Sequence, residues 1–409
     1  MNGDLDIFGE NIKKQFPFFR NNSEIVFLDN ASTSQKPDIV LDAMQKYYTQ
    51  DCANSGRGDY ALAGKARLNI EAVRKKVARF LGIARPNELA FVSGATEAMN
   101  LMALSFGLAA LQDQDEIILC MEEHASTILP WLNVVEILGS FGKKIIIKKI
   151  QLHPVGDYDL KAFEKLITSR TQLIVGTDVH NIYGLRMGLE KIVGGLPANI
   201  LTILDISQSV GHLPIDVEKL GVDGVVFSGH KMFAGTGIGG LWAGSKLFPL
   251  LAKAKVGSTL VPQEVSVKNH FEAGTPNIAG ILSLGAAVDF IEKIGLENIE
   301  KYLFELTSYL LEALKKLPSV EFLPGPGKAQ CSMGFGIISF KITGFQAADI
   351  GMILNDYGIC VRTGFACNAG AKEQDFIRVS LQIYNTSKDI DYLIKILTSI
   401  IFVTKPDSW

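Results

Sequence analysis

Two segments decide the fold: Leu201-Thr-Ile-Leu-Asp205-Ile-Ser-Gln208-Ser and Gly224-Val-Val-Phe-Ser228-Gly-His230-Lys231. In both, a short apolar run ends abruptly in polar and ionisable side chains. Runs that are apolar throughout are typical of strands covered on both faces, and such sheets bind ligands at the carboxyl ends of their strands. We therefore expect Asp205 and Lys231 to lie at a ligand site.

Asp205 and Lys231 are also the pair of side chains that pyridoxal phosphate needs. A lysine just past a buried strand can lose its proton and form a Schiff base. An aspartate there can keep the pyridine nitrogen protonated, so that the ring accepts electrons. A buried salt bridge at a strand end explains the same two residues equally well, so the pair alone leaves both interpretations open.

The segments around this pair predict an α/β fold. Short apolar runs alternate with helix-like patterns from about residue 87 to 245, which favours a mostly parallel sheet of seven strands. The expected strands are Leu89–Val92, Glu116–Met121, Lys144–Ile150, Leu173–Gly176, Leu201–Leu204, Gly224–Phe227 and Gly240–Ala243.

The 409 residues exceed what one core usually organises, so we expect two domains. After Pro276 a long amphipathic stretch, roughly 278–317, is expected to be helical and to lead into a smaller α+β C-terminal domain. The predicted units are an N-terminal arm (1–25) packed with the small domain, a large cofactor-binding domain (26–285) and the small domain (286–409).

Composition excludes several classes of protein. The net charge of -3 offers no electrostatic case for nucleic acid or an anionic membrane as partner. No secretory signal and no spanning apolar run are present, and five scattered cysteines argue against a disulfide framework. We expect a cytoplasmic protein. No Cys or His cluster has metal-ligand spacing, so no metal is predicted.

Two further strand ends carry polar residues. Ser93-Gly-Ala95-Thr96-Glu follows a predicted strand and opens a helix, where exposed amides and a hydroxyl suit a phosphate; an ordinary helix cap is the alternative. His124 follows another strand, where its ring could lie on an aromatic cofactor or be merely structural. The motif Gly235-Thr-Gly-Ile-Gly-Gly240 matches the dinucleotide fingerprint, but it leads into a strand, which argues against NAD.

A cysteine stands apart from the others in Val361-Arg362-Thr-Gly-Phe-Ala-Cys367-Asn-Ala-Gly370. A thiol in a glycine-bounded loop can be exposed, and a cation such as Arg362 could lower its pKa from about 8.5. A surface thiol without a role is the alternative. Arg378 is a candidate fork for a substrate carboxylate, or a member of a surface ion pair.

Taken together, the segments resemble the class V aminotransferase-like family of pyridoxal-phosphate enzymes of fold type I, and within it the cysteine desulfurases of the SufS type. The motifs that carry the resemblance run in order along nearly the whole chain: Phe27-Leu-Asp-Asn-Ala-Ser, Ser93-Gly-Ala-Thr-Glu, Glu123-His-Ala-Ser, His180-Asn-Ile-Tyr-Gly, Asp205-Ile-Ser-Gln, Ser228-Gly-His-Lys, Phe271-Glu-Ala-Gly-Thr-Pro-Asn, Val361-Arg-Thr-Gly and Tyr384-Asn-Thr.

The resemblance implies a role for each matching residue. Lys231 would carry pyridoxal 5'-phosphate and move the Cα proton, and Cys367 would take the sulfur of L-cysteine as a persulfide, leaving L-alanine. His124 would stack on the ring. The remaining implied contacts are Asp205 with the pyridinium, Gln208 with the phenolic oxygen, Ala95, Thr96, Ser228 and His230 with the phosphate, Thr275 with the phosphate of a second subunit in a homodimer, and Asn181 and Arg378 with the substrate carboxylate.

The chain departs from the SufS pattern at two places. Phe365-Ala366 stands where a histidine usually precedes the catalytic cysteine, and Gly56 stands where a histidine usually precedes Arg57-Gly58. Both changes remove possible proton donors near the thiol. The sulfur acceptor, expected to be a protein, is therefore left open.

Other functions remain compatible with the motifs. The cysteine loop also resembles the molybdenum-cofactor sulfurases, and a selenocysteine lyase or another amino-acid lyase or epimerase could use the same fold. A catalytically inactive sulfur-transfer scaffold is a further alternative, although Lys231, Asp205 and Cys367 are all present.

Overall fold

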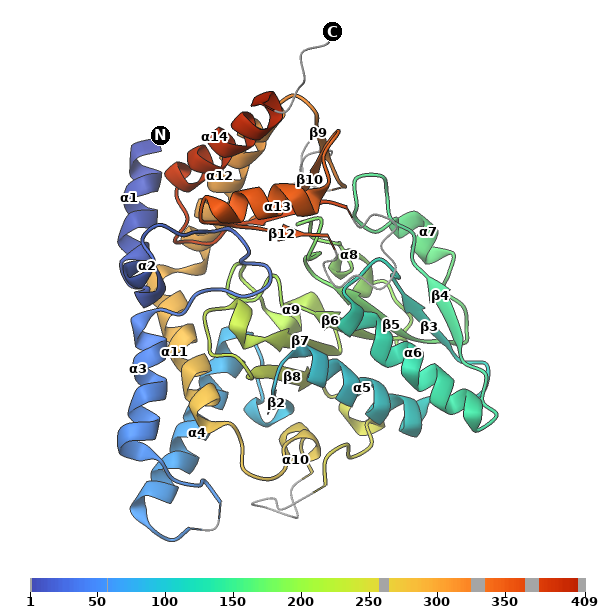
Figure 1. The fold of residues 1–409 in the computed structure, drawn as a ribbon. Helices are drawn as coiled ribbons and strands as arrows, with labels where there is room; N and C mark the ends of the chain where they lie inside the picture. The colour runs from blue at the N-terminus through green and yellow to red at the C-terminus, as the bar shows by residue number, and fades with distance from the viewer. Residues whose placement is uncertain (1, 57, 257–264, 325–334, 365–374, 404–409) are drawn as a thin grey trace.

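The structure is a computed structural model that describes residues 2–56, 58–256, 265–324, 335–364 and 375–403. A seven-stranded sheet lies at its centre (Figure 1). In spatial order its strands are β2 (Leu89–Val92), β8 (Gly239–Ala243), β7 (Gly224–Ser228), β6 (Leu201–Asp205), β5 (Thr171–Thr177), β3 (Glu116–Leu119) and β4 (Ile146–Lys149).

This sheet confirms the predicted α/β fold with its mostly parallel strands. From β7 to β4 every neighbouring pair is parallel, whereas β8 is antiparallel to both β7 and β2. As a result β2, β3, β5, β6 and β7 all end at the same edge of the sheet.

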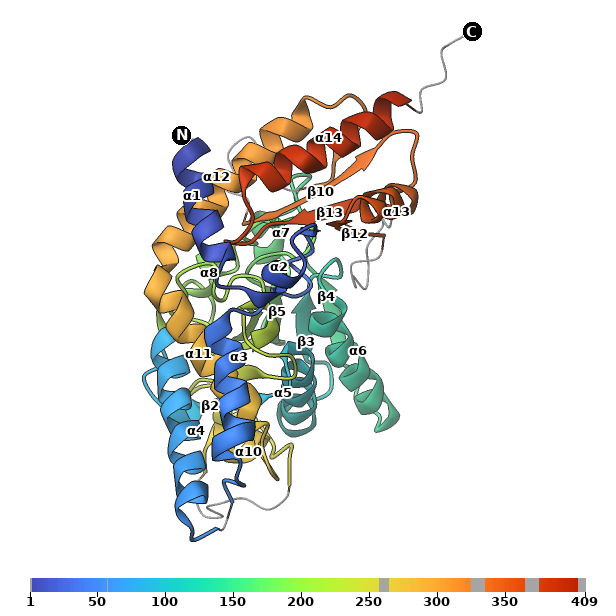
Figure 2. The same cartoon turned by 60° about the vertical axis from the view of Figure 1, so that its left-hand side comes forward.

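Helices cover both faces of the sheet, because alternate side chains of each strand point to opposite sides. In β3, Ile117 and Leu119 belong to one apolar cluster with α5 (Ala95–Ala110) and α6 (Ala125–Ser140), while Ile118 joins a second cluster. That second cluster includes side chains of α4 (Ala61–Phe80) and α11 (Ile278–Ile294). Figure 2 shows α3 (Asp38–Lys46), α4 and α11 running side by side.

The C-terminal part contains a smaller antiparallel sheet with helices beside it. The sheet has the order β12 (Arg362–Thr363), β13 (Ile377–Ser380), β10 (Ile337–Ile342) and β9 (Val320–Phe322). Its helices are α12 (Leu296–Lys315), α13 (Ala347–Asp356) and α14 (Ser387–Val403). Strand β1 (Val26–Phe27) pairs with β11 (Ile359–Cys360), so the N-terminal segment is joined to this part.

The stretch 278–317, expected to be helical, forms two helices separated at Gly295. Gly295 adopts φ +89°, which L-residues with a Cβ rarely adopt, so the chain changes direction there. Amphipathic periodicity continues on both sides of such a break, which is why the pattern alone did not reveal it.

The N-terminal helix α1 (Asn2–Lys13) lies beside the C-terminal helix α14, and the short helix α2 (Pro17–Asn21) follows α1 (Figures 1 and 2). Asp6 accepts hydrogen bonds from the backbone and hydroxyl of Ser387, and Lys13 forms an ion pair with Asp389 at 3.2 Å. The domain boundaries at 25/26 and 285/286 stay predictions.

The remaining helical segments are short and connect these elements. They are the π-helical turn η1 (Tyr47–Asp51), η2 (Pro86–Glu88), α7 (Leu160–Glu164), α8 (Glu190–Val193), α9 (Val217–Leu220), η3 (Gly229–Lys231), η4 (Phe248–Leu250) and α10 (Val267–Phe271). Among the described residues, no helix is long and apolar enough to cross a membrane.

Candidate active site

A cavity of about 260 Å³ opens at the carboxyl edge of the large sheet. Strands β5, β6 and β7 end there with Thr177, Asp205 and Ser228. Of the predicted site residues, ten line this cavity: Ala95, Thr96, His124, Asn181, Asp205, Gln208, Ser228, His230, Lys231 and Arg378. The fold therefore brings together residues from six separate segments of the chain.

Asp205 is a buried carboxylate with 6% of its surface exposed. One oxygen accepts the N–H of Ser207 at 2.9 Å and the other accepts the hydroxyl of Thr127 at 3.2 Å. Both donors are neutral, and among the residues that the structure describes no side-chain cation forms an ion pair with Asp205. A buried carboxylate in this state fits a cationic ligand group, such as a protonated ring nitrogen.

Lys231 ends the 3₁₀ turn η3, directly after β7. Four groups hold this turn through the carbonyl oxygen of His230: the hydroxyl of Thr33, the backbone N–H and hydroxyl of Ser34, and the ammonium of Lys36. Burial lowers the pKa of His230 to about 4, and the positive charges of Lys231 and Lys36 act in the same direction. His230 is therefore neutral at pH 7 and can donate one N–H to an anion.

The turn between β2 and α5 contributes Ala95 and Thr96 to the cavity. The N–H of Ala95 donates to the hydroxyl of Ser228 at 2.9 Å, which joins the start of α5 to the end of β7. Gly239, at the start of β8, lies against Gly94: a Cβ on Gly239 would stand 2.8 Å from the Gly94 Cα. The glycine motif 235–240 thus leads into strand β8, as expected, and not into the helix of a dinucleotide site. Its glycines allow the two backbones to pack closely.

His124 is the N-cap residue of α6. Its Nδ1 accepts the N–H of Ser126 at 3.2 Å, so the other ring nitrogen faces away from the helix. Burial lowers the pKa of His124 to about 4; the charge of Lys231 also lowers it, Asp205 opposes, and Arg378 lowers it further. His124 lines the cavity together with the charged side chains of Asp205, Lys231, Arg362 and Arg378.

Two arginines share one carboxylate at the side of the cavity formed by the small sheet. Arg378, 3% exposed on β13, donates to the carbonyl of Asn181 at 3.0 Å and to Asp29 at 3.0 Å. Arg362 on β12 reaches the second oxygen of Asp29 at 2.8 Å, and both guanidinium groups also donate to the hydroxyl of Ser32. Two cations against one anion leave a net positive charge, which suits a carboxylate ligand.

Gln208 also lines the cavity. Its side-chain amide donates to the carbonyl of Ala31 at 2.9 Å. Ala31 and Ser32 also line the cavity, although neither was predicted as a site residue. Their motif, Phe27-Leu-Asp-Asn-Ala-Ser, carries part of the family resemblance. Because the segment contains no long strand or helix, its pattern does not predict where it lies in the fold.

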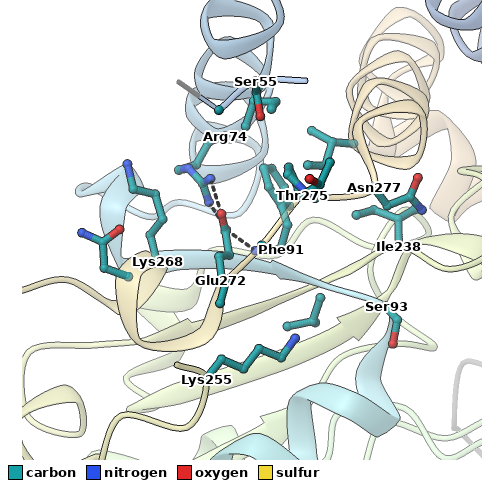
Figure 3. A pocket seen from close by; sticks show the side chains of 18 of the residues that line it. Ser55, Arg74, Phe91, Ser93, Ile238, Lys255, Lys268, Glu272, Thr275 and Asn277 are labelled. Carbon is teal, nitrogen blue, oxygen red and sulfur yellow. Dashed lines mark hydrogen bonds and ion pairs between the residues drawn. The ribbon is translucent and has the colours of Figure 1, made fainter. Parts of the chain in front are cut away.

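Thr275 lies outside this cavity. It lines a second and larger cavity of about 690 Å³ and accepts a hydrogen bond from the amide of Asn54 at 3.2 Å (Figure 3). On the same wall, Glu272 holds the buried guanidinium of Arg74 at 2.6 Å and the N–H of Phe91 at 2.7 Å. Within one chain, then, Thr275 is not part of the group around Lys231.

The predicted sulfur acceptor, Cys367, lies outside the described residues, as do Phe365, Ala366 and Arg57. Of the described cysteines, Cys120 is buried, and burial raises the pKa of its thiol, with the charge of Glu123 acting in the same direction. Burial also raises the pKa of the half-buried Cys360. Neither thiol has the lowered pKa of a nucleophile.

The comparison with known families agrees with this geometry. A model of the aminotransferase class-V family matches residues 26–393. The chain belongs to this family. Among its relatives is a cysteine desulfurase of Wigglesworthia glossinidia brevipalpis, 33% identical over 406 residues, which are 95% of this chain and 96% of the relative. Another is a probable cysteine desulfurase of Synechocystis sp., 34% identical over 95% of each chain.

Solved structures show the same fold. The apo cysteine desulfurase of Thermococcus onnurineus NA1 superposes with a TM-score of 0.85 at 29% identity, covering 96% of this chain and 98% of that one. The cysteine desulfurase CsdA of Escherichia coli, in an S-sulfonic acid form, gives a TM-score of 0.83 at 28% identity, with 95% and 97% covered. The predicted fold and family are confirmed.

Proposed function

We propose that this chain is a cysteine desulfurase that uses pyridoxal 5'-phosphate to convert L-cysteine to L-alanine, with the sulfur passing to Cys367. One observation carries the proposal: a single cavity is lined by a lysine, by a buried carboxylate without an ion-pair partner among the described residues, and by a pair of arginines. The relatives named cysteine desulfurase span nearly the whole chain, which supports the same reaction.

Each part of the cavity suits one part of the cofactor. Asp205 would face the ring nitrogen, His124 the ring and Gln208 the phenolic oxygen. The turn at Ala95 and Thr96, with Ser228 and the neutral His230, would hold the phosphate, because amides at a helix start favour anions. When bound, the cofactor supplies an aldehyde that can link covalently to an amine and a ring that withdraws electrons.

The residues of the chain then have defined tasks. Lys231 would hold the cofactor at rest and, once displaced, would carry a proton to and from the substrate Cα. Arg378 and Asn181 would orient the substrate carboxylate. The thiolate of Cys367 would attack the substrate sulfur, so that the C–S bond breaks and an S–S bond forms. Cysteine and the enzyme thiol thereby become alanine and an enzyme persulfide, without any outside oxidant.

We also propose a homodimer in which Thr275 contacts the phosphate of the other subunit. Support comes from its place in the large second cavity, separate from Lys231 but beside the same helix start: Ser93 and Glu97 line the second cavity, while Ala95 and Thr96 line the first. A protein sulfur acceptor, a cytoplasmic location and membership of the SufS type belong to this proposal too.

The test is to supply the purified chain, loaded with pyridoxal phosphate, with L-cysteine and a thiol reductant. We expect alanine and sulfide in equal amounts. Binding of cysteine without either product would refute the proposal and favour a different amino-acid substrate. Selenocysteine, compared at the same concentration, would separate a desulfurase from a selenocysteine lyase.

Replacement of Arg378 with lysine should raise the KM for cysteine about 10- to 100-fold with a smaller change in kcat. A lysine keeps the charge but loses the planar fork that donates to Asn181 and Asp29, and hydrogen bonds to charged groups contribute about 1.5–3 kcal/mol. Steady-state alanine formation measures both constants. An exposed arginine, changed as Arg79→Lys, is the matched control. An unchanged KM would remove Arg378 from the substrate site.

A further inference from the structure

We propose that His212 is a positioning residue that holds Gln208 in the cofactor cavity and links it to the segment that follows Arg378. This inference rests on the proposed function, because it concerns the same cavity. It assigns a task to a buried histidine that lines neither cavity and that no sequence motif singled out.

The contacts of His212 join two distant segments. The imidazole is 8% exposed, with Nδ1 3.1 Å from the carbonyl oxygen of Gln208 and Nε2 2.5 Å from the side-chain nitrogen of Gln382. Gln208 lines the cavity beside Asp205, and Gln382 follows Arg378 by four residues. Both ring nitrogens are therefore used, one toward each segment.

The hydrogen bonds determine the tautomer of the ring. The oxygen of the Gln382 amide accepts the N–H of Ile383 at 2.9 Å, which directs the NH₂ group at His212. Because that NH₂ group is a donor, Nε2 must accept, and Nδ1 must carry the hydrogen that it donates to Gln208. Burial lowers the pKa of His212 to about 4, so this neutral form persists at pH 7.

His212 closes a ring of contacts around one wall of the cavity. The Gln208 amide donates to the carbonyl of Ala31, and the N–H of Ala31 donates to the hydroxyl of Ser380 at 2.9 Å. Ser380 lies two residues before Gln382, which returns to His212. Gln208 is thus held from its backbone and from its side chain, and the strand that carries Arg378 is tied to both. A displaced Gln208 would change its contact with the phenolic oxygen.

Three variants separate the effects of the two hydrogen bonds of His212, to Gln208 and to Gln382. His212→Leu removes both; His212→Asn keeps a donor where Nδ1 stands; His212→Gln keeps an acceptor where Nε2 stands. We expect His212→Leu to weaken pyridoxal-phosphate binding to the apo chain about 10-fold and to shift the absorption maximum of the bound cofactor, since a tenfold change corresponds to one ordinary hydrogen bond. His212→Asn, which keeps the contact with Gln208, should restore the cofactor affinity and the absorption maximum. His212→Gln, which keeps the contact with Gln382 after Arg378, should instead restore the KM for cysteine.

The matched control is His270→Leu. His270 makes the same contact, Nδ1 to the carbonyl four residues earlier at 3.1 Å, but the residue it contacts, Ser266, lines neither cavity, whereas Gln208 does. Cofactor binding by the wild-type chain reports on the proposed function, and differences among the variants report on His212. Unchanged cofactor binding and absorption in His212→Leu would overturn the inference. The inference would also be overturned if all three variants lost the same cofactor affinity, in proportion to their loss of thermal stability as apo chains. That result would indicate that His212 contributes only packing.

Discussion

Lys231→Ala is expected to abolish covalent attachment of pyridoxal phosphate and to lower alanine formation from cysteine by at least about 10³-fold. Lys231 stands at the end of η3, in the cavity with Asp205 and His124, and Thr33, Ser34 and Lys36 hold its turn through the carbonyl oxygen of His230. Proton transfer by a positioned side chain contributes about 10²–10⁴-fold, and loss of covalent attachment adds to that effect.

Two measurements test this prediction. The absorption band of the lysine-linked cofactor should be missing in Lys231→Ala, and reduction with borohydride should leave no cofactor on the chain. Lys219→Ala, at a lysine whose side chain is 85% exposed, should keep both signals and the wild-type rate. Undiminished alanine formation by Lys231→Ala would disprove the assignment, as would a covalently labelled lysine elsewhere.

Cys367→Ala should lower sulfide and alanine formation by at least about 100-fold and leave cofactor binding unchanged. The substrate sulfur needs a thiolate acceptor, and among the described cysteines both Cys120 and Cys360 have raised pKa values, which makes them poor nucleophiles. The residues proposed to hold the cofactor do not include Cys367, so the absorption spectrum and the affinity for pyridoxal phosphate should match those of the wild type.

The control for this variant is Cys52→Ala, which removes an exposed thiol directly after η1. Mass spectrometry after a single turnover without reductant should find one added sulfur on Cys367 in the wild type and in Cys52→Ala, and none in Cys367→Ala. Sulfide release by Cys367→Ala at the wild-type rate would rule out the persulfide. Together with the lysine variant, this result separates binding of the cofactor from transfer of sulfur.

Local sequence was sufficient to predict the strands and the residues at their ends. Leu89–Val92 forms β2 with the predicted bounds, and the other six strands of the large sheet differ from expectation only at their termini. Asp205 and Lys231 were identified because an apolar strand that stops at an ionisable residue must deliver that residue to one edge of the sheet. The positions of these groups therefore followed from chain pattern and strand direction.

The local pattern of apolar and polar residues did not predict the contacts between distant segments. Nothing in the sequence indicated that Ala31 and Ser32 would join the cavity, because they lie there through hydrogen bonds to Ser380 and Arg378, about 350 positions away. The break at Gly295 was hidden because amphipathic periodicity describes a face and not the direction of the helix axis.

The sequence by itself determined the class of fold, the family and the chemistry of the strand-end residues, since all three depend on short-range patterns and on the order of motifs. Only the tertiary structure decided how the cavity is supported. The sharing of Asp29 by two arginines and the bridge from Gln208 through His212 to Gln382 join residues up to about 350 positions apart. Such contacts arise from the packing of one element on another, and the local pattern of hydrophobic and polar residues carries no record of that packing.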